Sequence, residues 1–185
     1  MQPLFAGKIF STVMSERIAQ MQKEIEKLKC ADVEGIDEKG LSAKAEKLAE
    51  KYVPRDIPSP EASGLSKGES VNGVAFWQLP FHGSVEYFNY MPAASLPPSE
   101  SNHFVEKIEN GNVYFLIDES SETARTDAEN RAHKTVQAIE KCLGRMRQDA
   151  DELYNLNKLK EAAILIFKKK QDSCAKLRSL GYAVR

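Results

Sequence analysis

The segment from Ser121 to Arg185 contains no proline and only two glycines, Gly144 and Gly181. Proline removes a backbone hydrogen-bond donor and glycine weakens helices through its entropy, so a segment this poor in both is suited to long helices. Its apolar residues recur at alternating steps of three and four, through Val136, Ile139, Leu143, Met146, Ala150 and Leu153. This spacing predicts a helix with one buried, heptad-like seam.

Beyond Leu153 the apolar pattern moves to a different helical face. It continues through Leu156, Leu159, Ala163, Ile166 and Phe167. A single unbroken helix would be about 80–90 Å long at 1.5 Å per residue, which is too long for a compact domain of this size. We therefore expect a turn or sharp kink near Asn155–Asn157, so that residues 121–180 form two antiparallel helices, a C-terminal helical hairpin.

Residues 1–53 predict another pair of helices. Apolar residues recur at helical intervals over residues 6–30 and again over residues 41–53, where Pro54 ends the pattern. The connection between the two is polar and contains glycine, so we expect a helical hairpin. Residues 54–70 are rich in proline, glycine and serine and are expected to form a loop.

Residues 71–118 predict a small antiparallel sheet of about four strands. Two aromatic-rich runs, residues 71–81 and 85–91, are separated by a His-Gly-Ser step. Between two further apolar runs stands Asn110-Gly111, a dipeptide that accepts the positive φ angles of a two-residue hairpin turn. The expected fold class is α+β. Residues 1–185 are expected to form a single domain, in which this sheet packs against long N- and C-terminal helices.

The near-zero net charge hides an acidic body and a basic tail. From Ala124 onward 14 Lys and Arg oppose 8 Asp and Glu, a net charge of +6, whereas 12 against 19 gives residues 1–123 a net charge of −7. A basic stripe on the C-terminal helices could contact nucleic-acid phosphates. Its members would be Arg145, Arg147, Lys158, Lys160, Lys168, Lys169 and Lys170. Few aromatic residues accompany them for base stacking, so a solvated face or an acidic protein partner is the preferred interpretation.

The three cysteines, Cys30, Cys142 and Cys174, are odd in number and widely spaced. That usage is typical of buried thiols in a reducing cytoplasm. The N-terminus shows no secretory signal pattern, and no apolar run reaches the roughly 18 residues of a membrane span. We therefore expect a cytoplasmic protein without a membrane partner.

The titratable residues do not form a recognisable catalytic pattern. The histidines His82, His103 and His133 are scattered, with no metal-ligand spacing among them or the cysteines. No Gly-rich phosphate loop, nucleophile elbow or metal-dependent nuclease motif is present. We therefore expect no catalytic residue, no cofactor and no enzymatic activity.

One acidic cluster, formed by Asp118, Glu119 and Glu122, lies where the last strand meets the long helix. Such a cluster can hold Mg²⁺. Acidic residues at a helix N-terminus also complement the helix dipole, and this second interpretation is favoured. Ser120, Ser121 or Thr123 would then supply the helix cap.

Several short motifs resemble the N-terminal, non-catalytic region of uncharacterised bacterial proteins, some of which carry a C-terminal restriction-endonuclease-like domain. The motifs are Leu79–Pro92 with Pro97-Pro98, Gly111-Asn112, Tyr154-Asn155, Lys169-Lys170, Leu180-Gly181 and Lys51–Pro54. The resemblance implies a regulatory or sensor module, or a protein-interaction module, in a bacterial assembly for which defence is a candidate role. The expected partner is another protein or a second copy, bound through the helices. Nucleic-acid binding by the basic helices is the alternative.

Overall fold

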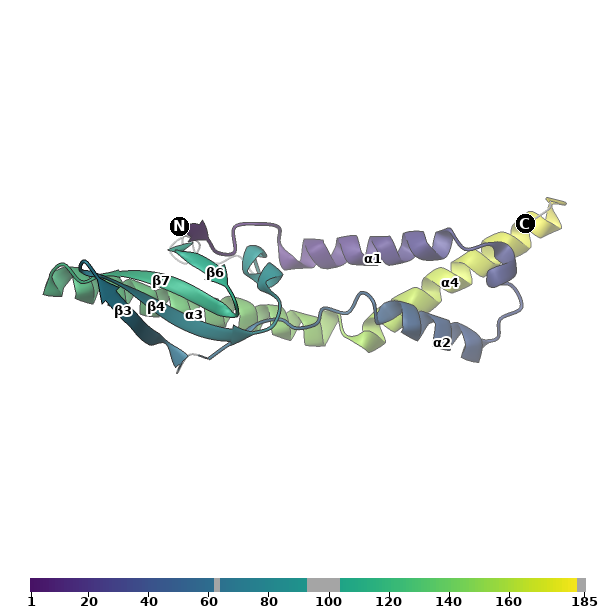
Figure 1. Cartoon of the computed structure of the whole chain (residues 1–185). Helices are drawn as coiled ribbons and strands as arrows, with labels where there is room; N and C mark the ends of the chain where they lie inside the picture. Colours follow the sequence, from purple (N-terminus) through teal and green to yellow (C-terminus); the bar gives the residue numbers. More distant parts are fainter. Residues whose placement is uncertain (62–63, 93–103, 183–185) are drawn as a thin grey trace. The chain divides into compact units, whose positions relative to one another are not determined.

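A computed structural model describes residues 1–61, 64–92 and 104–182 of the chain (Figure 1). The chain divides into two compact units. The sheet unit consists of Met1–Ser11 and Arg55–Asp149, and the helical unit consists of Thr12–Pro54 and Ala150–Arg185. The predicted α+β class is confirmed, since an antiparallel sheet and long helices make up the structure.

The sheet unit contains a five-stranded antiparallel sheet in the order β2-β4-β7-β6, with β3 also paired to β4. A separate two-stranded ladder joins β1 to β5. The bounds are β1 Gln2–Pro3, β2 Ser59–Pro60, β3 Ser66–Val71, β4 Val74–His82, β5 Phe104–Val105, β6 Lys107–Glu109 and β7 Asn112–Asp118. The longest register runs from Val74 opposite Asp118 to Pro80 opposite Asn112. The pairing of β4 with β7 is therefore the centre of this unit.

Two Asn-Gly turns connect the strands. Asn110 and Gly111 have φ angles of 50° and 72°, and they join β6 to β7 as the sequence predicts. Asn72 and Gly73, with φ angles of 53° and 77°, join β3 to β4 in the same way. Both residues of such a turn need positive φ, which asparagine and glycine adopt at low cost. The second turn lies inside what the apolar pattern predicted as one strand over residues 71–81.

Two local predictions are wrong. Residues 85–91 do not form a strand, because η3 is a 3-10 helix over Val85–Asn89. Tyr87 and Phe88 are adjacent and both buried, which a strand with one buried face does not allow. Residues 54–70 are also not a simple loop, since β2 and most of β3 lie within them. The polar sequence of β3 hides it from a search for alternating apolar residues.

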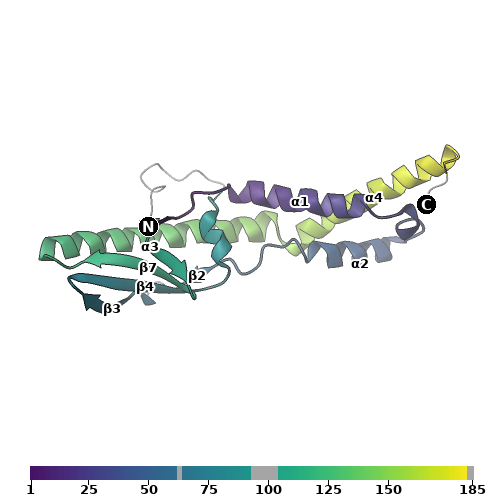
Figure 2. The same cartoon turned by 45° about the horizontal axis from the view of Figure 1, so that its top comes forward.

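The long helix α3, Glu122–Leu153, lies along one face of the sheet in both views (Figures 1 and 2). The side chains of β4 and β7 alternate, and those that face α3 are buried. This buried set includes Ala75, Leu79, Phe81, Val113, Phe115 and Ile117. The predicted seam of α3 is also buried from Val136 to Ala150, whereas Leu153 is 56% exposed and does not belong to it.

The helical unit contains most of α1 (Phe10–Glu26), the short η1 (Cys30–Asp32), α2 (Glu38–Ala49) and α4 (Leu156–Ser179). α2 packs chiefly against α4. Their shared core is made of apolar residues from all of these elements: Met21, Ile25, Cys30, Val33, Leu41, Ala45, Ala49, Tyr52, Leu159, Ala163, Phe167 and Cys174. The sequence predicted that the two N-terminal helices pack against each other as a hairpin, whereas α2 packs chiefly against α4 and α1 joins them in the shared core.

Side-chain caps fix where two of these helices begin. Asp37 precedes α2 and accepts a hydrogen bond from the backbone N–H of Gly40 at 2.8 Å. Asn155 precedes α4 and accepts one from the backbone N–H of Lys158 at 3.0 Å. Such caps satisfy donors that have no partner inside the helix. The Asn155 cap confirms the predicted break near Asn155–Asn157.

A disulfide links Cys30 of η1 to Cys174 of α4, with their Cα atoms 5.6 Å apart. Cys142, which is buried in α3, is not part of a disulfide. The prediction of three buried thiols is therefore wrong for two of them. The two bonded residues are separated by 144 positions, so no local spacing pattern could have indicated the bond. The bond depends on the tertiary contact between η1 and α4, which brings the two cysteines together.

Candidate functional site

The seven basic residues predicted as a nucleic-acid surface are almost all engaged within the chain. In α3, Arg145 lies 3.4 Å from a carboxylate oxygen of Asp149. Arg147 donates to the backbone carbonyl of Pro58 at 2.7 Å. Both contacts are internal to the sheet unit. They hold these guanidinium groups against the protein, which leaves them less available for phosphate.

The basic residues of α4 pair mainly with the acidic N-terminal helices. The Lys160 ammonium lies 2.6 Å from Glu46, and that of Lys168 lies 3.3 Å from Glu38. Lys170 donates to the backbone carbonyl of Glu26 at 2.9 Å. All of these contacts lie inside the helical unit.

The last turns of α4 continue the same arrangement. Arg178 pairs with Glu34, whose side chain is mostly buried. Lys158 pairs with Glu161 along the helix at 3.7 Å. Lys169 is the one member of the predicted stripe whose ammonium has no hydrogen bond or ion pair among residues 1–61, 64–92 and 104–182. Exposed pairs of this kind contribute little stability, but they offset positive charge locally. Within the helical unit, acidic residues of the N-terminal elements thus neutralise several basic residues of α4.

The histidines do not come together. His82 lies 3.0 Å from Glu61 and is largely exposed. The ring of His133 meets that of Trp77 edge-on at 6.4 Å between centroids. His103 lies outside the described residues. Within the described part of the chain, no three His, Cys, Asp or Glu side chains are grouped so that they could hold a metal ion.

The acidic cluster at the start of α3 is engaged in capping and pairing. Asp118 accepts a hydrogen bond from the backbone N–H of Ser120 at 2.9 Å, and the Ser120 hydrogen bonds lower the pKa of this carboxyl. Glu119 pairs with Lys67 of β3. Ser121 accepts a hydrogen bond from the backbone N–H of Ala124 at 3.1 Å. Ser121 therefore supplies the side-chain cap that the sequence assigned to one of three residues.

The open face of the sheet, which points away from α3, exposes an apolar pair. Phe76 of β4 and Leu116 of β7 are register partners, and they are 45% and 48% exposed. Tyr114 is next to Leu116 on the same side of β7, and the Lys107 ammonium lies 4.9 Å from the centre of its ring. We call the surface formed by Phe76, Tyr114 and Leu116 the open-face patch. The sequence pattern does not predict the open-face patch, because its members come from two strands that are distant in the chain.

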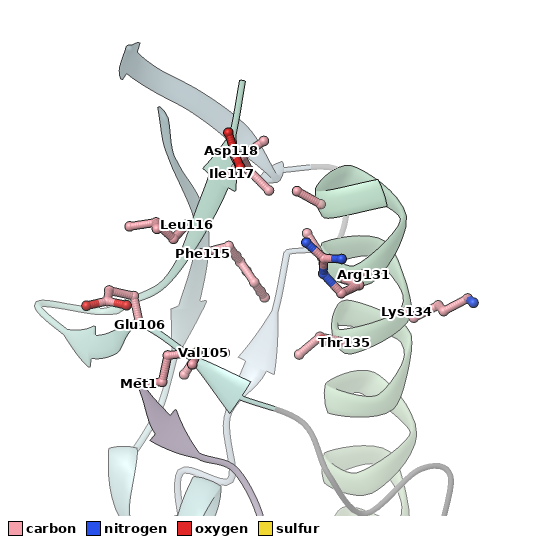
Figure 3. A pocket seen from close by; sticks show the side chains of 12 residues that line it. Met1, Val105, Glu106, Phe115, Leu116, Ile117, Asp118, Arg131, Lys134 and Thr135 are labelled. Carbon is pink, nitrogen blue, oxygen red and sulfur yellow. The ribbon is translucent and has the colours of Figure 1, made fainter. Parts of the chain in front are cut away.

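A cleft of about 650 Å³ lies between β7 and α3 (Figure 3). Its lining residues come from the N-terminus, β5, β7 and α3: Met1, Val105, Glu106, Phe115, Leu116, Ile117, Asp118, Ala128, Arg131, Ala132, Lys134 and Thr135. Figure 3 shows the Arg131 side chain on the strand side of α3, whereas the Lys134 side chain points away from the strand. None of these residues was predicted as a functional residue except Asp118.

The chain matches no family model, no curated protein and no solved structure. The resemblance to the N-terminal region of bacterial proteins with an endonuclease-like domain therefore stays a prediction. None of the described helices combines the length and the apolar character needed to cross a membrane.

Proposed function

We propose that the chain is a non-catalytic protein-interaction module that associates with a second copy through the open-face patch. The observation that carries this proposal is the exposed Phe76–Leu116 pair. Two large apolar side chains that are adjacent on a sheet and half exposed are characteristic of a surface that another protein covers.

The charges around the patch favour a second copy as the partner. Lys107 lies beside Tyr114 at one end of the patch, and Asp118 lies at the far end of β7. A twofold axis near Leu116 would bring Lys107 of one copy toward Asp118 of the other. Closed dimers use the same patch on both copies, so each patch must be complementary to itself. The open-face patch has an apolar middle, with Lys107, which also pairs with Glu109 of its own chain at 2.5 Å, at one end and Asp118 at the other.

Sedimentation velocity of the full chain over a range of concentrations tests the proposal. We expect a dimer that Phe76→Ser and Leu116→Ser each convert to monomer. Val85→Ser is the matched control, because Val85 is 49% exposed in the same unit but lies outside the patch. A wild-type chain that stays monomeric, or a Val85→Ser variant that dissociates equally, would contradict the proposal.

A charge exchange sharpens the test of the twofold arrangement. Lys107→Asp and Asp118→Lys should each weaken the dimer, because each places like charges together. The two substitutions combined should restore it, since the opposite charges then meet again. If the combination is as weak as the sum of its parts, the proposed geometry is wrong.

Nucleic-acid binding is the second candidate, supported by the net charge of +6 from Ala124 onward and by Lys169, whose ammonium has no ion pair within the part of the chain that the structure describes. We expect no binding of duplex DNA or RNA at near-physiological salt in fluorescence anisotropy. Tight binding that weakens steeply with salt, and that is lost when Lys168, Lys169 and Lys170 are all changed to Glu, would favour this candidate. The regulatory role and the defence context rest on the resemblance and stay predictions.

The cytoplasmic location also stays a prediction, and the Cys30–Cys174 disulfide counts against it. Disulfides persist mainly in oxidising compartments. Alkylating the protein under denaturing conditions, directly after its native host cells are lysed, would count the free thiols. One modified cysteine indicates an oxidising location, and three indicate a reducing one.

A further inference from the structure

The cleft between β7 and α3 has the size of a small-molecule site. Its volume is about 650 Å³, and ligand pockets commonly measure about 300–1,000 Å³. Its space arises from the sequence of α3. Ala128 and Ala132 stand one turn apart on the cleft side of the helix, and both are buried. Because these side chains end at Cβ, the helix leaves room beside the strand.

The walls of the cleft are mostly apolar. Phe115 and Ile117 come from β7, and Val105 comes from β5. All three are buried in the described structure. The Phe115 ring points toward α3 (Figure 3). Because Phe115 and Val105 are only 4% and 2% exposed and Ile117 is fully buried, these walls offer a ligand a small apolar area, and Met1, which also lines the cleft, is 90% exposed.

One cation faces this apolar space. The Arg131 guanidinium lies on the strand side of α3, whereas Lys134 and Glu106 point away from the space between strand and helix (Figure 3). Within residues 1–61, 64–92 and 104–182, Arg131 makes no hydrogen bond or ion pair. Asp118, an acidic lining residue from β7, accepts a hydrogen bond from the Ser120 N–H, and its pKa is lowered chiefly by Ser120 and to a smaller extent by the charge of Arg131.

We propose that the cleft binds a small amphipathic carboxylate, with its apolar body against the apolar lining of the cleft and its carboxylate on Arg131. A planar guanidinium can bind a carboxylate through two parallel hydrogen bonds, which fixes both the position and the orientation of the ligand. The apolar walls select a ligand with a hydrocarbon body. The cleft and the open-face patch adjoin at Leu116, which lines the cleft although its side chain points away from α3 (Figure 3).

Titration of the full chain with decanoate near neutral pH tests this proposal. Isothermal titration calorimetry gives the affinity. Emission from Trp77, the only tryptophan, reports on the same layer because Trp77 is the register partner of Phe115. Decanol and decyltrimethylammonium carry the same hydrocarbon body with a neutral or cationic head. We expect saturable binding of one decanoate and at least tenfold weaker binding of the other two, and equal binding of all three would overturn the proposal.

Arg131→Gln should weaken decanoate binding about tenfold or more, since a hydrogen bond to a charged group contributes on the order of a tenfold change in affinity. Lys134→Gln is the matched control, because it removes the same charge from a residue of the same helix that also borders the cleft but whose side chain points away from the strand. Ala132→Leu should fill the space and abolish binding. If Arg131→Gln and Lys134→Gln have the same effect, or if decanoate does not bind, the proposal is wrong.

Discussion

The sheet unit and the helical unit hold their folds by different means. In the sheet unit, seven consecutive register pairs join β4 to β7, and a long helix covers the buried face. In the helical unit, α1, η1, α2 and α4 share one core, and a disulfide and several ion pairs tie α4 to the N-terminal elements. One unit relies on backbone pairing and burial. The other adds a covalent cross-link.

The separation in sequence explains this difference. β4 and β7 begin 38 residues apart, at positions 74 and 112. α4 must instead find elements more than 100 residues away, and the bonded cysteines are separated by 144 positions. Closing a longer loop costs more conformational entropy, and a cross-link removes much of that cost from the unfolded chain. The helical unit should therefore be the more sensitive of the two to loss of a single bond.

Removing the disulfide should have the largest effect. The double variant Cys30→Ala/Cys174→Ala is expected to lower the free energy of unfolding by about 2–5 kcal/mol. Hydrogen exchange should show lost protection in α2 and α4, with β4 and β7 unchanged. Cys142→Ala is the matched control, since it removes a buried thiol of α3 that is not part of a disulfide. Equal loss of protection in both units would contradict the comparison.

Truncating the buried seam of α3 should affect the sheet unit instead. Ile139 is fully buried, so Ile139→Ala is expected to cost about 3 kcal/mol in the free energy of unfolding. Chemical denaturation measures this loss, and hydrogen exchange should place it in β4 and β7. Leu153→Ala, at the exposed end of the same helix, should change stability little. A silent Ile139→Ala variant would show that the seam is not a core.

The hairpin turns predict a smaller effect. Gly111 has a φ angle of 72°, so Gly111→Val should cost roughly 1–2 kcal/mol, because a β-branched residue is strained there. Gly73→Val should lower the stability by a similar amount, since Gly73 has a φ angle of 77°.

Gly144→Ala should instead raise the free energy of unfolding. Gly144 is helical, and an added Cβ would meet only the Arg147 guanidinium in ordinary contact at 3.9 Å, so alanine should stabilise α3 by up to about 1 kcal/mol. Denaturation midpoints that move the same way in all three would contradict these turns.

The smallest predicted effect is a pH dependence within the helical unit. Tyr52 donates a hydrogen bond to Glu24 at 2.6 Å, which lowers the pKa of Glu24 together with the contact from Lys51. A lowered pKa in the folded state stabilises the protein above the pKa of the unfolded chain. This stabilisation is lost as the pH falls through the lowered value. Because Glu24 is nearly half exposed, the effect should be below about 1 kcal/mol.

At high pH the hydrogen bond between Tyr52 and Glu24 makes the stability of the protein fall as the pH rises. Burial and the bond to Glu24 raise the pKa of Tyr52 to about 12. The folded state then keeps a proton that the unfolded chain releases near pH 10, so stability falls between about pH 10 and 12. When denaturation midpoints are plotted against pH, Tyr52→Phe should reduce both the loss of stability at acidic pH and the loss at alkaline pH. A variant with the same profile as the wild type would show that this hydrogen bond does not form.

Features that depend on residues close together in the chain were predicted correctly from the sequence. The seam of α3 from Val136 to Ala150, the break before Leu156 and the Asn110-Gly111 turn all follow from residues close together in the chain. Asn72-Gly73 offered the same turn chemistry as Asn110-Gly111. It was missed because β3 before it is polar, so only its pairing with β4 makes it a strand. The cleft was missed because Phe115 and Ala132 belong to different elements.

The sequence by itself determined the local backbone of this protein: where helices are continuous, where Asn155 begins a new one and where Asn-Gly reverses the chain. These choices depend on steric limits and capping groups within a few residues. Only the tertiary structure decided that Cys30 bonds to Cys174, and that Lys160 and Lys168 pair with the acidic N-terminal helices. Such contacts join residues more than 100 positions apart, and their energies depend on distance in space, which composition and spacing do not specify.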